Sequence, residues 1–368
     1  MRILHIHSDW KFLPSLASYD NPKIENEVIF IGDKHEERVD IEYFPFTKKN
    51  IIDIANIAET FDIVIFYSLR LEHSLICEKI SSKVIVIWRF FGAELYSLLN
   101  KELLSKESQR YFNPQRIHHA LSVIKNTILY SAPAETIFWR AVNRADYISG
   151  LSTAEYDYLK NRFDKLPPFI QLPFRWIEPR QNIGPRNIIL LGHSKDIYGN
   201  HLEVLRRLTV NPSMCDYNFV MFFSYGQGSE RYTNAVINEV KAYDNIRVIN
   251  EFLGRKEYEE IVGKASALVI NSYRQQGMGN VFGALRNGIK VYLSENNVMC
   301  DWLVKEGFIV GTLEDFMYDI SKNNVALSPE QVSHNVKVYK RLTEKYSVEG
   351  YHQLLLSLIK ECDEDSSN

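Results

Sequence analysis

The sequence predicts an α/β protein of two domains, each built on a parallel sheet covered by helices. Short apolar segments typical of buried strands alternate with longer segments of helical periodicity. This alternation runs twice along the chain, and a proline-rich segment separates the two runs. At 368 residues the chain is also long for one hydrophobic core and long enough for two.

The first run of alternation begins at the N-terminus. Buried strands are expected at residues 2–8, 27–32, 62–68 and 83–90, with helices at 50–61 and 71–81. A mainly helical section from Glu94 to Val142 follows, and then a strand at 146–152 and a helix at 153–163. These elements predict an N-terminal domain over residues 1–178.

A cluster of prolines ends this domain. Prolines stand at positions 167, 168, 173, 179 and 185. Proline lacks a backbone N–H and interrupts both helices and central strands, so the second half of this segment is expected to be an interdomain linker.

The second run of alternation predicts a C-terminal domain over residues 186–328. Strands are expected at 187–194, 217–223, 246–250, 267–272 and 289–294, and helices at 199–208, 231–243, 255–265 and after Gly279. The last helical segment, 329–362, extends beyond what this domain needs and is expected to pack across both domains. The polar tail 363–368 is expected to be disordered. Together the two runs predict two Rossmann-like domains.

Composition narrows the classes of function. A formal net charge of -3 and a pI near 6.4 give no signature of nucleic-acid binding. Four cysteines lack the spacing of metal ligands, which predicts reduced thiols, a cytoplasmic protein and no metal site. No uninterrupted apolar run of about 18 residues occurs, so any membrane attachment is expected to be peripheral. No cofactor is predicted.

One region has an excess of basic residues. Between Lys101 and Arg180, 12 lysines and arginines stand against 8 aspartates and glutamates. Within it, residues 101–144 mix basic and aromatic side chains on helical segments. This pattern suits a helix lying on the cytoplasmic face of the inner membrane, and it equally suits amphipathic core helices whose charged ends reach water.

Polar, glycine-bearing loops follow three strands of the second domain. They span His193–His201, Ser224–Tyr232 and Arg274–Asn280, the last with the sequence RQQGMGN. Ligands of open α/β sheets bind at the carboxyl ends of strands, and a helix that begins after a glycine turn offers unpaired N–H groups to an anion. These loops therefore predict a site for a phosphorylated ligand. The dinucleotide and P-loop fingerprints are both missing.

Three motifs carry a resemblance to a known family. They are WRFFGAELYSL at Trp88–Leu98, ILLGHSKDIYGNHLEVLRRL at Ile189–Leu208, and RQQGMGN followed by NGIKVYLSENN. In order and spacing the chain resembles the bacterial 4-acetamido-4,6-dideoxygalactose transferases of glycosyltransferase family 56, from the first strand to about residue 316. His193 departs from the asparagine of the family motif, and Ser224, Tyr225 and Gly226 replace a different turn.

The resemblance implies a GT-B fold, in which two Rossmann-like domains face each other across a cleft. It also implies that the N-terminal domain, 1–178, binds the acceptor and that the C-terminal domain, 186–328, binds the nucleotide sugar. It implies metal-independent transfer, with inversion, from dTDP-4-acetamido-4,6-dideoxygalactose to a polyprenyl-diphosphate-linked saccharide, in the assembly of a surface polysaccharide such as O-antigen or enterobacterial common antigen. Donor contacts are then expected from the following residues: Gly192, His193, Ser194, Asn200, Ser224, Tyr225, Gly226, Glu251, Phe252, Arg274, Gln275, Gln276, Gly277, Met278, Gly279 and Asn280.

Arg274 and the helix start have the most specific expected role. In this reaction the nucleoside diphosphate leaves with developing negative charge, which N–H groups and a cation can stabilise. We expect Arg274 to supply the cation and residues 277–280 the N–H groups. The alternative for Arg274 is a salt bridge that only fixes its loop.

Two carboxylates are candidates for the base that deprotonates the acceptor hydroxyl. Asp9 follows the first strand and is slightly preferred, and Glu94 follows the fourth. The alternatives are a turn or cap role for Asp9 and a place at a helix N-terminus for Glu94. His7, Trp88 and Gly92 are expected to contact the acceptor.

The sequence is also compatible with three alternative functions. The donor can be another dTDP-, UDP- or GDP-sugar within the same class of enzyme. A nucleotide-sugar epimerase has the same architecture and needs no acceptor. A third alternative is a protein that binds a nucleotide sugar without catalysis, for which only the donor loops would be functional.

Overall fold

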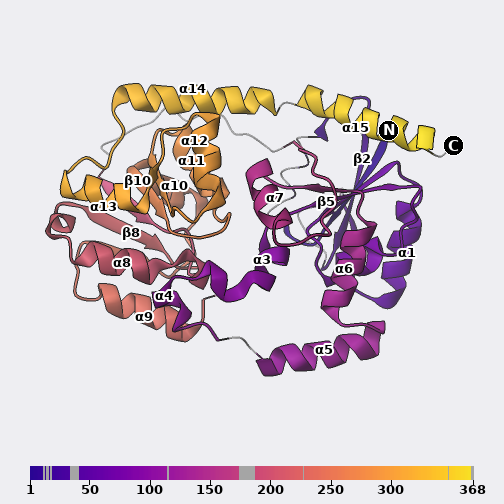
Figure 1. Cartoon of the computed structure of the whole chain (residues 1–368), viewed down its shortest axis with the longest axis horizontal. Coiled ribbons are helices and arrows are strands. Elements are labelled where there is room, and N and C mark those ends of the chain that lie inside the picture. Colours follow the sequence, from indigo (N-terminus) through magenta and orange to yellow (C-terminus); the bar gives the residue numbers. More distant parts are fainter. Residues whose placement is uncertain are drawn as a thin grey trace. The chain divides into compact units, whose positions relative to one another are not determined.

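The computed structural model describes residues 1–10, 13, 16, 19–33, 41–113, 116–173, 187–226, 228–346 and 348–365, with the backbone alone at 100, 116–119, 348–350 and 360–365. The chain divides into two compact units (Figure 1). Unit 1 comprises Met1–Leu95, Pro114–Trp176 and Lys345–Asn368, and unit 2 comprises Tyr96–Asn113 and Ile177–Glu344. The expected linker falls within 174–186, which lies outside the described residues.

Unit 1 contains a sheet of six parallel strands. They are β1 (Arg2–His7), β2 (Glu25–Ile31), β3 (Glu42–Phe44), β4 (Ile63–Tyr67), β5 (Ile85–Arg89) and β6 (Tyr147–Ser149). Their order in the sheet is β3-β2-β1-β4-β5-β6. All the strands expected in this half are present. The sequence missed β3, because a three-residue edge strand has no apolar run.

Helices accompany this sheet in unit 1. They are α1 (Lys48–Ala58), α2 (Leu71–Cys77), the start of α3 (Ala93–Leu99), α5 (Arg116–Tyr130), α6 (Ala134–Arg144), α7 (Thr153–Lys160) and α15 (Val348–Asp365). Apolar side chains on one face of the central strands form a core with Leu355 and Leu358 of α15. The C-terminal helix therefore belongs to unit 1, although the chain enters it from unit 2.

Unit 2 repeats the strand order of unit 1. Its strands are β7 (Ile188–Leu191), β8 (Asn218–Phe222), β9 (Ile246–Ile249), β10 (Ala265–Ile270), β11 (Lys290–Leu293) and β12 (Gly311–Thr312), in the order β12-β11-β10-β7-β8-β9. In both sheets the first strand lies between the second and the fourth, which is the Rossmann order. The two-residue β12 was again too short for the sequence pattern to reveal.

The helices of unit 2 are α4 (Lys106–Gln109), α8 (His201–Thr209), α9 (Glu230–Val240), α10 (Arg255–Gly263), α11 (Met278–Arg286), α12 (Val298–Glu306), α13 (Leu313–Ser321) and α14 (Pro329–Lys345). Short 3-10 turns occupy Asn100–Leu103, Ile197–Gly199 and Pro212–Asp216. The main core packs α8, α9 and α13 against the sheet through Leu205, Val236 and Phe316.

Three boundaries differ from those expected. Residues 96–113 lie within the expected N-terminal domain in sequence but belong to unit 2, where Leu104 joins the core. The final helical segment is two helices, since α14 ends at Lys345 and α15 begins at Val348. The helix α15 also continues to Asp365, so the first residues of the expected tail are helical. Among the described residues, no helix is both long and apolar enough to cross a bilayer.

Candidate functional site

The site in unit 2 lies where strand order reverses. The strands β7 and β10 are neighbours, and the loops that leave their carboxyl ends lead to helices on opposite faces of the sheet. A crevice forms at such a point because the two loops diverge, and it is the usual ligand site of open α/β sheets. These loops, Gly192–Asn200 and Asn271–Gly277, contain half of the donor contacts that the sequence predicted.

Asn200 and Asn271 join the two loops. The Asn200 side-chain amide donates to the carbonyl of Asn271 at 3.2 Å, and the Asn271 amide donates to the carbonyl of Asn200 at 3.3 Å. The Asn200 amide also donates to Leu103, and its oxygen accepts from the N–H of Ser105 at 2.8 Å. Asn200 is fully buried, so it holds the loops and the 96–113 segment together. This differs from the expected donor contact.

Arg274 holds the positive charge of the site. One of its terminal nitrogens lies 3.5 Å from Oδ2 of Asp196, and both side chains are largely buried. The Gln276 amide donates to the same carboxylate oxygen at 3.1 Å. The guanidinium lies 5.6 Å from the ring centre of Tyr96 and 5.1 Å from that of Tyr198. Within the residues that the structure describes, its Nε has no hydrogen-bond acceptor.

The salt bridge proposed as the alternative for Arg274 is therefore present. At 3.5 Å it is longer than a well-formed charged hydrogen bond, so the guanidinium keeps donor capacity for an anion. The sequence predicted Arg274 and Gln276 but left Asp196, Tyr96 and Tyr198 out of the site. Asp196 could have been found, since it stands in the second motif of the resemblance.

The helix α11 begins beside Arg274. Gly277 is its N-cap residue with φ of 68°, and a Cβ there would lie 2.8 Å from Nδ1 of His193. The first intrahelical donors are Asn280 and Val281, which bond to the carbonyl of Gly277. The N–H groups of Met278 and Gly279 precede these bonds, and a Cβ at Gly279 would meet open space. An anion can therefore approach this helix end closely.

His193 lies under the helix start and is neutral. Burial, and to a smaller extent the charge of Arg274, lowers the pKa of His193 from 6.5 to about 4. Its Nε2 lies 3.5 Å from the hydroxyl of Ser194, which is also buried. Gly192, with φ of 74°, leaves room for the ring of His201. A neutral imidazole adds a polar group to the crevice without repelling the guanidinium.

The loop after β8 joins the site through Tyr225 and Asn280. The carbonyl of Tyr225 accepts from the N–H of Lys195 at 2.8 Å, and Gly226, with φ of 110°, passes close to the backbone of Asp196. The Tyr225 side chain hydrogen-bonds with Asn280, and Tyr258 does so at 2.7 Å. Tyr258 and Asn280 stand 22 positions apart in the chain, so no local sequence pattern reveals this contact.

Asn297 supports the Arg274 loop from the next strand. Its amide donates to the carbonyls of Ser272 at 2.9 Å and Arg274 at 3.0 Å, and its oxygen caps α12 at Met299. The backbone that carries Arg274 is therefore fixed from two sides, by Asn297 and by Asn271.

The other predicted donor residues occupy different surroundings. Gln275 is partly exposed on the Arg274 loop, Ser224 is partly exposed at the end of β8, and Met278 is buried in the first turn of α11. Glu251 and Phe252 follow β9, which is the edge strand and lies two strands from β7. With 86% of its surface exposed, Phe252 contributes little to the packing of unit 2.

In unit 1, Glu94 lies in the first turn of α3, directly after β5. Its Oε1 accepts from the N–H of Leu69, after β4, and from the indole N–H of Trp88, on β5, both at 3.2 Å. Burial raises the pKa of the Glu94 carboxyl. Trp88 has no exposed surface, so it positions Glu94 and cannot itself touch an acceptor in this conformation. Gly92, with φ of 101°, forms the turn before α3.

His7 and Asp9 stand at the end of β1 in the same unit. His7 is fully buried and stacks on Tyr67 with ring centres 3.6 Å apart. Burial, and then the neighbouring His5 and His73, lower the pKa of His7 well below its usual value. Among the described residues neither ring nitrogen has a hydrogen-bond partner. Asp9 is partly exposed beyond the strand end.

His5 is fully buried in the core of unit 1. Its two ring nitrogens lie 3.1 Å from the Tyr67 hydroxyl and 3.0 Å from Oδ1 of Asn26. In the part of the chain that is described, no group of His, Cys, Asp and Glu side chains could hold a metal ion.

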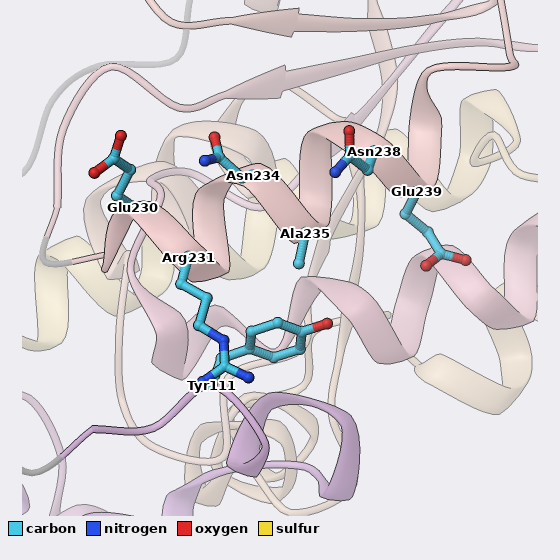
Figure 2. Close-up of a pocket in the computed structure, with 7 residues that line it drawn as sticks. All are labelled: Tyr111, Glu230, Arg231, Asn234, Ala235, Asn238 and Glu239. Carbon is cyan, nitrogen blue, oxygen red and sulfur yellow. The ribbon is translucent and has the colours of Figure 1, made fainter.

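A separate groove runs along α9, outside the strand-end site. Its volume is about 870 Å³, and Figure 2 shows Tyr111 and Arg231 facing each other below the helix. The guanidinium of Arg231 lies 5.6 Å from the Tyr111 ring centre. The lining residues on the helix extend from its first to its last turn, from Glu230 to Glu239, so the groove follows the helix and does not enter the crevice.

The buried His193 predicts acid sensitivity of folding. Its pKa is about 4 in the folded chain and near 6.5 in the unfolded chain, so below pH 6.5 the unfolded state takes up the proton first. Stability then falls as the pH drops from 6.5 toward 4, and this histidine accounts for about 2 kcal/mol of the loss by pH 5.

Replacing His193 by asparagine is expected to remove the part of the acid-induced loss of stability that this histidine causes. Urea denaturation at pH 7 and pH 5 measures it, since the difference in free energy of unfolding between the two conditions should shrink by about 2 kcal/mol. An unchanged difference would show that His193 takes up its proton at an ordinary pH inside the folded protein.

Solved structures similar to this chain share its fold. No protein-family model matches the sequence, and no curated protein does. The lipopolysaccharide outer core galactosyltransferase WaaB, in its apo form, has a TM-score of 0.63 at 13% identity, over 97% of this chain and 99% of that one. Anabaena HepE in complex with UDP and glucose has a TM-score of 0.63 at 10% identity, over 98% and 100%. Sucrose-phosphate synthase from Thermosynechococcus elongatus has 0.61 at 11% identity, over 98% of each chain.

At such low identities these similarities concern the fold alone. They span nearly the whole of both chains in each comparison, so the similarity extends over both Rossmann-like units. The predicted fold class is thereby confirmed: the chain is an α/β protein with the GT-B fold.

Proposed function

We propose that the chain is a glycosyltransferase that moves a sugar from a nucleoside-diphosphate donor to a saccharide hydroxyl. The observation that carries the proposal is the pairing of Arg274 with the open start of α11 at the switch point of unit 2. A guanidinium and a helix N-terminus side by side suit a diphosphate. A protein of the same fold, HepE, was solved in complex with UDP and glucose, which supports this class of donor.

In the proposed reaction, unit 1 provides the base and unit 2 binds the donor. In an inverting transfer a base takes the proton of the acceptor hydroxyl, the hydroxyl oxygen bonds to the anomeric carbon, and the bond from that carbon to the phosphate oxygen breaks. The electrons of that bond leave with the nucleoside diphosphate. Arg274 and the N–H groups of Met278 and Gly279 stabilise this charge.

We infer that Glu94 is the base, with Asp9 as the second candidate. The pKa of Glu94 is raised by burial, and a base with a raised pKa works closer to neutral pH. The contacts from Leu69 and Trp88 hold its carboxylate in place. The slight preference for Asp9 from sequence is therefore reversed in this proposal.

The finer proposal follows the resemblance. The donor is dTDP-4-acetamido-4,6-dideoxygalactose, the acceptor is a polyprenyl-diphosphate-linked saccharide, and the reaction needs no metal. An acceptor of this kind is embedded in the inner membrane, so the proposal includes peripheral attachment of the chain to the cytoplasmic face of that membrane.

Thermal shift with dTDP, UDP, GDP and CMP at equal concentrations tests the donor. A nucleotide present at about 100 times its dissociation constant stabilises the native state by about 2.7 kcal/mol. We expect dTDP to raise the melting temperature most. A larger shift with UDP or GDP would keep the class of enzyme and change the donor, and no shift with any nucleotide would refute the role of the Arg274 crevice.

A product assay separates transfer from its alternatives. Purified chain, dTDP-sugar and lipid-linked acceptor should yield a longer glycolipid, with and without EDTA. An altered sugar nucleotide in the absence of acceptor would identify an epimerase. Nucleotide binding without any product would identify a binding protein.

Two glycine substitutions separate folding from anion binding at the start of α11. Gly277→Ala places a methyl group against the His193 ring at positive φ, so we expect a fall in melting temperature and loss of nucleotide binding. Gly279→Ala points into open space and favours the helix, so the melting temperature should stay or rise slightly.

Nucleotide affinity is the decisive readout for Gly279→Ala. The added methyl group occupies the space by which a phosphate reaches the N–H groups, so affinity for the dTDP-sugar should fall about tenfold or more. Calorimetric titration measures it. Affinity equal to that of the wild type would show that the diphosphate does not approach this helix end.

A further inference from the structure

The helix α5 presents apolar side chains to solvent. Leu121, Ile124 and Ile128 are 59%, 56% and 75% exposed, whereas the polar Asn126 on the same helix is only 7% exposed. A surface helix normally turns its apolar stripe toward the core and its polar residues outward. In α5, by contrast, these three apolar side chains face solvent and the polar Asn126 is buried.

The spacing shows that the exposed side chains form one stripe. Leu121, Ile124 and Ile128 stand at i, i+3 and i+7, which places them on one face of an α-helix. The next helix, α6, is ordinary, because it buries Ile137, Ala141 and Val142. The second interpretation of this basic region, amphipathic core helices, therefore holds for α6 and fails for α5.

Basic side chains accompany the apolar stripe. Lys125 follows Ile124 and is exposed, and the sequence of α5 contains no aspartate or glutamate. At the end of the helix Tyr130 lies against Phe46, with ring centres 6.2 Å apart, and the Lys48 ammonium lies 5.9 Å from the Tyr130 ring centre. Phe46 is 42% exposed, so the turn before α1 extends the apolar surface.

We propose that this surface, here called the α5 face, docks on a lipid bilayer that contains anionic headgroups. Its residues are Phe46, Lys48, Lys49, Leu121, Ile124, Lys125 and Ile128. Lys49 is included because it is exposed next to Lys48 in the first turn of α1. Aliphatic and aromatic side chains enter the boundary between headgroups and acyl chains, while lysines at the rim meet negative headgroups.

Charge favours a membrane over a second copy of the chain. In a twofold dimer the same patch faces itself, so the lysines at 48, 49 and 125 of two copies would approach each other. The α5 helix provides no carboxylate to neutralise them, and such like-charge contacts oppose association. An anionic bilayer matches both the apolar stripe and its basic rim.

The inference deepens the proposed function by naming the surface that meets the membrane. It rests on that proposal only for the choice of the cytoplasmic leaflet. The α5 face lies in unit 1 and the nucleotide crevice in unit 2, so the two can be tested separately.

Vesicle flotation of the full chain tests the α5 face. We expect the wild type to float with phosphatidylcholine vesicles containing about 30% phosphatidylglycerol and to bind pure phosphatidylcholine much less. The triple variant Leu121→Gln, Ile124→Gln, Ile128→Gln should bind the anionic vesicles at least about tenfold more weakly. Its melting temperature should hold, because the three side chains are already exposed.

Two further variants sharpen the comparison. Val210→Gln removes a side chain that is 79% exposed in unit 2 and should leave flotation unchanged. The variant Lys48→Gln, Lys49→Gln, Lys125→Gln should lose the preference for phosphatidylglycerol. Thermal shift with dTDP should give the same result for every variant, so a failed membrane test and a failed nucleotide test are distinguishable.

Three results would overturn the inference. Wild-type protein that binds neither kind of vesicle has no docking surface. A triple variant that floats like the wild type places the surface elsewhere. A wild-type dimer in analytical ultracentrifugation that becomes monomeric in the triple variant identifies the α5 face as an interface between copies.

Discussion

Replacing Glu94 by glutamine is expected to lower kcat for sugar transfer by about 10² to 10⁴, because a positioned general base contributes that much to a proton transfer. Glutamine keeps an oxygen that can accept from Leu69 and Trp88, so the loops after β4 and β5 should stay in place. Binding of the dTDP-sugar should not change, since its expected contacts lie in unit 2. Steady-state kinetics and calorimetric titration of the donor provide the two readouts.

Asp9→Asn is the matched comparison, because it makes the same chemical change at the other candidate. If Asp9 is the base, this variant and not Glu94→Gln will show the loss of kcat. Should both variants keep kcat within a few-fold of the wild type, neither carboxylate is the base. A pH profile adds a second test: the pKa of Glu94 is raised, so the acid limb of kcat/KM should lie above the pKa of an ordinary glutamate and disappear in Glu94→Gln.

Replacing Arg274 by glutamine is expected to lower kcat by about 10² to 10³, which is the usual effect of removing one group that stabilises developing negative charge. Donor affinity should fall as well, because the guanidinium meets the diphosphate before the bond breaks. Arg274→Lys keeps the charge but loses the forked donors, so it should recover only part of the activity. Steady-state kinetics with the dTDP-sugar and lipid acceptor measure all three proteins.

Asp196 separates catalysis from loop fixation. Asp196→Asn breaks the ion pair with Arg274 but leaves the guanidinium in the crevice. If Arg274 only fixes its loop, Asp196→Asn and Arg274→Gln will lower the melting temperature and the activity alike. If Arg274 stabilises the leaving group, Asp196→Asn will retain far more activity than Arg274→Gln.

Local periodicity determined most of the secondary structure. Buried parallel strands such as β4 and β10 are continuous apolar runs, because both faces of the sheet are covered. The same pattern shows the division into halves, since the alternation of strands and helices restarts after the prolines. The edge strands β3 and β12 were missed because two or three residues cannot show a period.

The sequence also located the loops of the candidate site, because ligand sites of α/β sheets follow strand ends and glycines permit close approach there. The sequence alone determined that Arg274, Gln276 and Gly277 stand on such a loop. It could not determine that Asn200 is a buried link to the 96–113 segment, since this depends on hydrogen bonds between residues nearly a hundred positions apart.

Tertiary structure decided which groups meet and which face outward. The strand order places β7 beside β10 and so brings Asp196 to Arg274, a neighbourhood that no local pattern contains. It turns the apolar stripe of α5 to solvent, although the sequence suits a core helix and a membrane-surface helix equally. Periodicity specifies that a helix has an apolar face, but only the packing of the whole chain decides what that face meets.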